Sequence, residues 1–235
     1  MVNDMKWIIM VALVWLGFGV KAQFSIGGGA STLFQFGNPK PYVGMHLNVE
    51  FPRNNEVTFY GRATYHFRQK ISSAEDDFGN PYGVFATAKD PTTVPSSVVL
   101  PASYNESFNY LMIDGGTRYY LINGYDEGFS LYGGTNIAVI INTVRNSLKV
   151  DGLTSFYELS VPDQRLVDEN RGTVLNLAAG ITGGAKYTIP GRGSIYFDIN
   201  PSLMLFGLQS NQNFTSTMYK NVVFNFNIGY RKEIY

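Results

Sequence analysis

Apolar and polar residues alternate with a period of two along most of the chain after residue 22. Between residues 42 and 51, Val43, Met45 and Leu47 are apolar, and the polar His46 and Asn48 alternate with them. Successive side chains of a β-strand point to opposite faces. The pattern therefore predicts strands that have one apolar face and one polar face.

Eight segments of this kind follow one another along the chain. They span residues 23–36, 42–51, 57–69, 108–122, 128–144, 173–189, 194–208 and 217–231. The connections after the second, fourth and sixth segments are short, whereas we expect long external loops near residues 70–107 and 145–172. Bacterial outer-membrane barrels have an even strand number, short periplasmic turns and longer external loops. The chain is thus predicted to be all-β, with residues 23–235 forming an eight-stranded antiparallel up-and-down transmembrane β-barrel.

The same periodicity would also fit a soluble, lipocalin-like barrel, in which the apolar faces point inward. The polar faces favour the membrane, because they carry few charges of both signs among many Asn, Ser, Thr and Tyr residues. Such faces suit the narrow interior of eight strands, which side chains can fill. Aromatic residues near the strand ends also resemble interfacial girdles: Phe67, Tyr119, Tyr120, Phe129, Tyr132, Tyr187, Tyr196 and Tyr230.

The charged residues of the polar faces are predicted to form a structural network inside the barrel. They are Glu50, Arg62, Arg68, Asp114, Arg118, Lys186, Asp198 and Arg231. Buried charges persist when they are paired. We expect Lys186 to pair with Asp198 across the turn at residues 190–193, since they flank it at similar heights. The alternative is a conducting pore lined by charge, for which an eight-stranded lumen is narrow.

The first residues resemble a secretory signal peptide. Lys6 precedes an apolar run that ends at Val20, and small Ala22 suits a cleavage site. The run is shorter than the roughly 20 residues of a membrane-spanning helix. Residues 1–22 are therefore predicted to be removed on export, which places the mature chain in the bacterial outer membrane.

The composition excludes several other classes of function. The chain has no cysteine, so disulfides, thiolate metal sites and cysteine nucleophiles are absent. Its formal net charge is zero and its basic residues are scattered, so no nucleic-acid partner is expected. His46 and His66 lie on the polar faces of adjacent predicted strands, but well over about 10 Å apart at roughly 3.3 Å per residue. No catalytic residue, cofactor or metal site is predicted.

The middle of the chain resembles a known family. Residues 109–120 (NYLMIDGGTRYY) and 129–136 (FSLYGGTN) are similar to the central hairpin of the small outer-membrane β-barrel proteins common in Bacteroidota. In that family a strand ends in a basic residue and paired aromatics, and an aromatic–glycine strand follows a tight turn. Met112-Ile113-Asp114 stands where the family usually has an apolar–Pro start. The resemblance implies an eight-stranded barrel and no particular activity.

The expected function is therefore that of a non-enzymatic integral outer-membrane barrel. It would act as a structural or binding protein through its external loops, as a possible subunit of an envelope complex. Its expected partners are outer-membrane lipid and a protein at loops 70–107 and 145–172. Two alternatives remain open at this point: a barrel that transports small solutes or hydrophobic compounds, and an outer-membrane enzyme with a Ser–His pair on the barrel.

Overall fold

The computed structural model describes residues 23–35, 41–73, 83–126, 128–151, 156–159, 170–209 and 222–234. The predicted signal peptide, residues 1–22, lies outside the described residues, as do residues 217–221 of the eighth predicted strand. Eight long strands make up most of the fold: β1 (Phe24–Gln35), β2 (Tyr42–Pro52), β3 (Val57–Ser73), β5 (Ser97–Ile122), β6 (Phe129–Val150), β8 (Asn170–Ile189), β9 (Gly193–Gln209) and β10 (Val222–Ile234).

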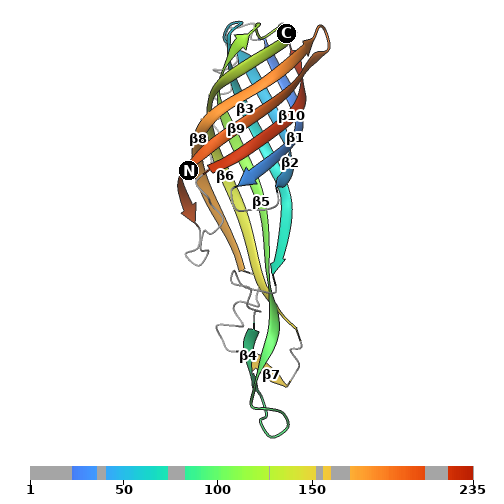
Figure 1. The fold of residues 1–235 in the computed structure, drawn as a ribbon, viewed down its shortest axis with the longest axis vertical. Coiled ribbons are helices and arrows are strands. Elements are labelled where there is room, and N and C mark those ends of the chain that lie inside the picture. The colour runs from blue at the N-terminus through green and yellow to red at the C-terminus, as the bar shows by residue number, and fades with distance from the viewer. Residues whose placement is uncertain are drawn as a thin grey trace, which may run out of the picture.

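The eight long strands form a closed ring. Each pairs antiparallel with its neighbours, in the order β3-β2-β1-β10-β9-β8-β6-β5, and the pairing of β3 with β5 closes the ring. The pairing of β1 with β10 joins the two ends of the chain. A closed sheet leaves no unpaired edge, which lipid would not tolerate. The predicted eight-stranded antiparallel barrel is confirmed, and Figure 1 shows its strands wrapped into a barrel.

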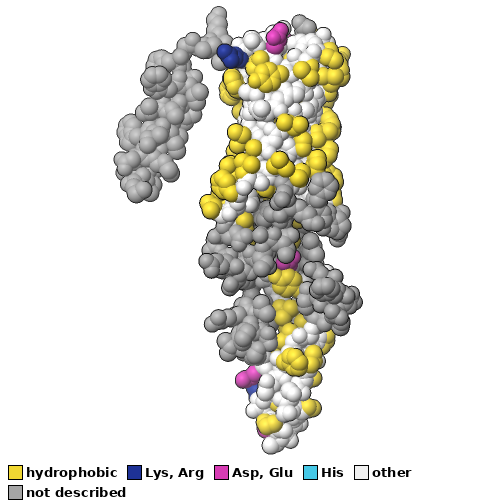
Figure 2. All heavy atoms as spheres, turned by 60° about the vertical axis from the view of Figure 1, so that its left-hand side comes forward, with side chains coloured by type: hydrophobic (Ala, Val, Ile, Leu, Met, Phe, Trp, Pro, Cys, Tyr) yellow, Lys and Arg dark blue, Asp and Glu magenta, His cyan; other side chains and the backbone are white. Residues whose placement is uncertain are grey.

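The strands turn their apolar faces outward. In β2, Val43, Met45 and Leu47 are 51%, 65% and 70% exposed, whereas the alternating His46 and Asn48 are each 3% exposed. A soluble barrel would show the opposite arrangement, since its apolar residues fill the interior. Apolar side chains accordingly gather on the barrel surface seen in Figure 2. In the described part of the chain, no helix is both long and apolar enough to cross a membrane.

Short turns join the strands at one end of the barrel. Asn54 Oδ1 accepts the backbone N–H groups of Glu56 and Val57 at 3.0 and 2.7 Å, which closes the turn between β2 and β3. Between β8 and β9, Gly191 has a φ of 69°, a left-handed conformation that glycine adopts at little cost. The carboxyl end of β10 lies at this same end of the barrel (Figure 1).

At the opposite end, parts of β3, β5, β6 and β8 continue far beyond the barrel. We call this part of the fold the extension. Strand β5 has 26 residues and β6 has 22, although a membrane-spanning strand needs only about 9–11. Two short strands, β4 (Gly83–Ala88) and β7 (Tyr157–Leu159), pair with each other, and β4 also pairs with the far part of β5. The segments predicted as loops near 70–107 and 145–172 are therefore largely strands wherever the structure describes them (Figure 1).

The extension has an apolar core of its own. The core consists of Val84, Ala86, Leu100, Ala102, Leu148 and Leu159, with Val98, Tyr104, Val150 and Tyr157 packed against it. At the tip, the Thr92 hydroxyl and then its backbone N–H donate to Asp90, and these bonds hold the pKa of that carboxyl below its usual value. Burial of these apolar side chains gives the extension a defined shape.

Candidate functional site

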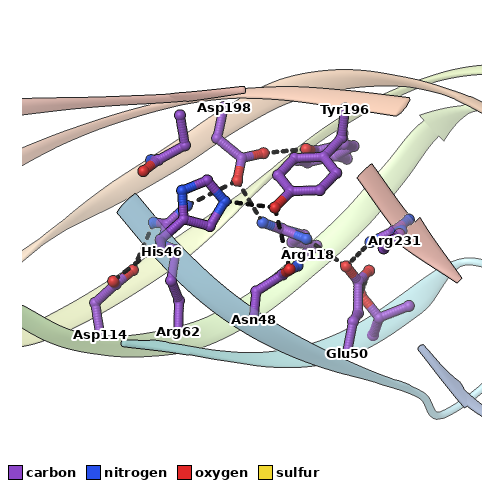
Figure 3. A network of polar contacts seen from close by, with 12 residues as sticks. His46, Asn48, Glu50, Arg62, Asp114, Arg118, Tyr196, Asp198 and Arg231 are labelled. Carbon is purple, nitrogen blue, oxygen red and sulfur yellow. Dashed lines mark hydrogen bonds and ion pairs between the residues drawn. The ribbon is translucent and has the colours of Figure 1, made fainter. Parts of the chain in front are cut away.

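Seven of the eight charged residues predicted inside the barrel are buried there. Glu50, Arg62, Asp114, Arg118, Lys186, Asp198 and Arg231 are each at most 3% exposed. Six of them form one continuous chain of ion pairs across the lumen, which we call the lumen network (Figure 3). Lys186 is not a member of it.

One half of the lumen network is centred on Arg62. Its Nε and Nη2 donate to the two carboxylate oxygens of Asp114 at 3.1 and 2.6 Å. Its Nη1 donates to Asp198 at 2.9 Å. Strand β3, which carries Arg62, and strand β9, which carries Asp198, are separated by three strands in either direction around the ring. The Arg62–Asp198 pair therefore crosses the barrel from wall to wall.

The other half of the lumen network is centred on Glu50. Arg118 and Arg231 both donate to its Oε2, and Thr58 and Tyr120 donate to its Oε1 at 2.6 and 2.8 Å. Arg118 also donates to Asp198 at 2.7 Å, which joins the two halves. Every carboxylate of the network thus contacts a guanidinium group, the condition under which buried charges are tolerated.

Arg68 differs from the prediction, because it is exposed on the outer surface of β3. The pairing of β3 with β5 shifts between His66 and Gln69. A β-bulge of this kind changes which face the following residues occupy. Gln69 is half-buried instead, and its side chain donates to the backbone oxygen of Pro41 at 2.5 Å.

Lys186 does not pair with Asp198, contrary to the prediction. In the register of β8 and β9, Lys186 lies opposite Tyr196 and Asp198 lies opposite Gly184. The Lys186 ammonium group is buried without a hydrogen-bond partner. It lies 4.1 Å from the ring centre of Tyr125 and 4.8 Å from that of Tyr120, as in cation–π contacts.

Three tyrosines predicted at the membrane interface lie inside the barrel. Tyr120, Tyr132 and Tyr196 are buried, whereas the other aromatic residues of the predicted girdle are exposed. Tyr132 donates to Asp198, and Tyr196 lies 2.5 Å from His46 Nε2. A signal for two of them was present in the sequence, since Tyr120 and Tyr196 are an even number of residues from Arg118 and Asp198 and so share their faces.

The lumen also contains a serine next to a histidine, the pair that the enzyme alternative requires. Ser31 Oγ lies 3.4 Å from His66 Nε2, but the carboxamide oxygens of Asn225 and Asn227 are closer, at 2.7 and 2.8 Å, and its single hydroxyl hydrogen can be donated to either of them. Both Ser31 and His66 are buried. This hydroxyl is therefore not aimed at the histidine as a nucleophile paired to a base would be.

No metal site is evident in the part of the chain that the structure describes, because no three His, Asp or Glu side chains meet there in a suitable group. His46 lies opposite Thr64 and His66 lies opposite Gly44 in the β2–β3 pairing. His66 is therefore two residues away from the position opposite His46, and such diagonal neighbours lie only about 7–8 Å apart. The predicted separation of well over about 10 Å is thus wrong, because the strands pair two residues out of the register expected for a turn centred on residues 52–56.

Apolar side chains also gather across the lumen between the lumen network and the extension, among buried polar residues such as Gln35, Asn142 and Asn176. The buried apolar side chains are Leu33, Tyr42, Phe108, Tyr110, Met112, Ala138, Ile140, Val144, Ala178 and Val223, and Met204 packs against them. Together they come from seven of the eight strands of the ring. We call this set the apolar plug. The lumen is thus crossed twice, once by ion pairs and once by hydrocarbon side chains.

Comparison with known proteins identifies the fold. No model of a protein family matches the sequence, and no curated protein matches it as a relative. A major outer membrane protein from Thermus thermophilus superposes with a TM-score of 0.58 at 10% identity, over 92% of this chain and 100% of that chain. This similarity shows the fold of a bacterial outer-membrane barrel.

Two further solved structures are similar at lower TM-scores. Neisserial surface protein A has a TM-score of 0.48 at 10% identity, over 91% of this chain and 97% of its own. Ail of Yersinia pestis, in complex with the heparin analogue sucrose octasulfate, has a TM-score of 0.40 at 16% identity, over 90% of this chain and 97% of its own.

Proposed function

We propose that the protein is a non-enzymatic, integral outer-membrane barrel that binds a partner outside the cell through its extension. The main observation behind this proposal is that β5 and β6 are longer than a membrane span requires and continue past the barrel. In the extension they bury an apolar core that is separate from the barrel. At about 3.3 Å per residue, β5 reaches roughly 85 Å from end to end, and residues 97–107, beyond the part that lies in the barrel wall, account for about 36 Å of this length. A surface held this far from the membrane suits recognition of another molecule or a place in an envelope complex.

The closed lumen supports a binding role over transport. The lumen network and the apolar plug both contain contacts between opposite or distant walls of the barrel. Moving a solute through would require breaking buried ion pairs, which is costly because each partner would be left as an uncompensated buried charge. The export signal and the outer-membrane location are part of the same proposal.

Photo-crosslinking in intact cells tests the binding role. A photoreactive amino acid replaces Phe85, which is 69% exposed on the extension, and in a matched variant it replaces Ile137, which is 61% exposed on the barrel. We expect a discrete adduct of higher mass from position 85 and none of that mass from position 137. If position 85 gives no adduct although the barrel is folded, the extension is not a binding surface.

A further inference from the structure

Polar side chains occupy the lumen between the lumen network and the apolar plug. On β9, the inward-facing Asn200 lies between Asp198 of the lumen network and Met204, which packs against the apolar plug. The same order recurs on β10, where two asparagines lie between Arg231 and Val223. Six side chains at this level, each at most 2% exposed, form a set that we call the polar layer: Thr64, Asn136, Thr182, Asn200, Asn225 and Asn227.

Members of the polar layer from separate strands meet around one region of the lumen. Asn200 on β9 lies directly opposite Asn225 on β10. Asn136 on β6 donates to Ser202, two residues from Asn200, at 3.1 Å. From the other direction, the hydroxyl of Ser31 on β1 lies 2.7 Å from Asn225 Oδ1. The polar layer therefore spans the lumen and is not confined to one wall.

Every member of the polar layer has a side-chain atom without a hydrogen-bond partner. These atoms are Oγ1 of Thr64 and Thr182, Oδ1 of Asn136, Nδ2 of Asn225 and Asn227, and both Oδ1 and Nδ2 of Asn200. Native proteins pair the great majority of their buried polar groups with protein or ordered water, because an unpaired buried group has given up its hydrogen bonds to solvent without replacement. Seven such atoms in one layer indicate that a group other than protein binds them.

The unpaired atoms include both donors and acceptors. The Nδ2 groups of Asn200, Asn225 and Asn227 only donate, the Oδ1 atoms only accept, and the threonine hydroxyls can do either. An anion would satisfy only the donors, and a metal cation would satisfy only the acceptors. A water molecule both donates and accepts, and a buried one typically makes about three hydrogen bonds. The chemistry of the polar layer therefore fits water.

Glycines leave room for water at this level of the lumen. Gly180 lies directly opposite Asn136, and Gly134 lies directly opposite Thr182, so both glycines take inward positions. Asn136 reaches Ser202 across Gly180, which has no side chain to separate them. The interior of an eight-stranded barrel is just wide enough for side chains to fill. Inward positions without a side chain therefore provide space beside the unpaired atoms.

We infer that the polar layer is a binding site for a cluster of ordered water molecules inside the barrel. The ion pairs of the lumen network cross the lumen on one side of this layer, and the side chains of the apolar plug cross it on the other. A larger polar solute would have to pass one of these, whereas water can be enclosed when the barrel closes. The bound water supplies the hydrogen bonds that Asn200 does not make to other side chains.

A crystal structure of the folded mature protein, at a resolution that shows ordered water, tests the site directly. We expect water density within hydrogen-bond distance of both Oδ1 and Nδ2 of Asn200, and of at least one further unpaired atom of the polar layer. Density for an ion or a larger solute at these atoms would overturn the inference. So would a layer in which the six side chains have closed up and bond one another directly.

Two substitutions of Asn200 test the site independently, through unfolding in urea from lipid vesicles. Leucine has the same branched shape but cannot bond water, whereas serine is smaller and keeps a hydroxyl that can. With water in the layer, Asn200→Leu should raise the unfolding equilibrium constant at least about tenfold, and Asn200→Ser should raise it less. Met112→Leu, a change between apolar side chains in the apolar plug, is the control and should have a smaller effect than Asn200→Leu.

A dry layer predicts the reverse order for the two substitutions. Leucine would then replace an unpaired amide by hydrocarbon, which is neutral or stabilising, and serine would leave an empty space, which is destabilising. That order would overturn the inference. The different mobility of unheated and boiled protein on a gel shows whether each variant forms the barrel. If Asn200→Leu does not fold, the density around Asn200 in the wild type decides.

Discussion

Two carboxylates of the lumen network, Glu50 and Asp198, each contact two arginines from other strands, so their charges hold separate parts of the wall together. Asp198 on β9 contacts Arg62 on β3 and Arg118 on β5. Removing such a carboxylate leaves two buried guanidinium groups with fewer compensating charges. Lys186 is the opposite case, because its ammonium group contacts aromatic rings and has no hydrogen-bond partner.

Asp198→Asn should therefore be strongly destabilising. Breaking a buried ion pair from one side costs about 3–5 kcal/mol. The measurement is a urea titration in lipid vesicles, read as the fraction of protein that keeps its folded mobility on an unheated gel. Asp151→Asn is the matched control, because the Asp151–Lys149 pair is exposed and exposed pairs contribute only about 0–1 kcal/mol. Equal losses from both variants would contradict a stabilising lumen network.

Lys186→Met should change the stability far less than Asp198→Asn. Methionine has a similar length and removes a buried charge that no hydrogen bond compensates, although it also removes cation–π contacts of up to about 2 kcal/mol. The same titration should show a difference from wild type of at most about 2 kcal/mol, in either direction. A loss as large as that of Asp198→Asn would mean that Lys186 has a partner in the network.

The sequence predicted which charged residues face inward but not which of them meet. Alternation alone identifies the faces of Glu50, Arg62 and Asp198, because residues an even number of positions apart in one strand share a face. Partners across the lumen depend on the order of strands around the ring and on register. The bulge after His66, which turns Arg68 outward, depends on tertiary pairing that no local pattern specifies.

At the level of strands, the outward apolar faces and the extension differ in their surroundings. Ile137 on β6 and Phe85 on β4 are similarly exposed in the isolated chain, at 61% and 69%. The proposed location puts Ile137 against hydrocarbon near the middle of the barrel and Phe85 in water or against a partner. The same substitution at the two sites therefore separates a membrane surface from a solvent surface.

Ile137→Arg should destabilise the folded barrel by about 2–4 kcal/mol, the range for arginine near the bilayer midplane. Phe85→Arg should stay within about 0.5 kcal/mol of wild type, as expected for a surface site away from special features. Unfolding in urea from vesicles measures both. Similar losses at the two positions would show that the barrel surface does not face lipid.

The strands of the barrel were predictable, but those of the extension were not. Residues 71–107 look like a loop, because the segment starts with acidic residues and ends rich in Pro, Val and Ser. Pro101 lies near the ends of two pairings: the pairing of β5 with β4 ends at Pro101, and its pairing with β6 ends beside it, at Ala102. The Pro101 carbonyl accepts the backbone N–H of Asp151 at 2.9 Å. Proline is tolerated at the end of a strand pairing, where its missing N–H is least needed. These pairings depend on the whole sheet and not on the local sequence.

For the whole molecule, the two layers in the lumen predict that the barrel does not conduct ions. Purified protein in planar bilayers should give no steady single-channel steps, because the ion pairs of the lumen network and the side chains of the apolar plug both cross the lumen. A boiled sample serves as the control for contaminating activity. Reproducible steps from the folded protein alone would favour the transport alternative.

The most direct test of the whole account is the labelling of single cysteines on intact cells, which is possible because the chain has none of its own. Ser96→Cys lies in the extension and Arg192→Cys in a turn at the opposite end, and both side chains are exposed. The reagent is a maleimide attached to a polymer too large to cross the outer membrane. The account predicts labelling of Ser96→Cys on intact cells and of Arg192→Cys only after lysis. Labelling of Arg192→Cys alone on intact cells, or of neither variant before lysis, would contradict an outer-membrane barrel that presents its extension outside the cell.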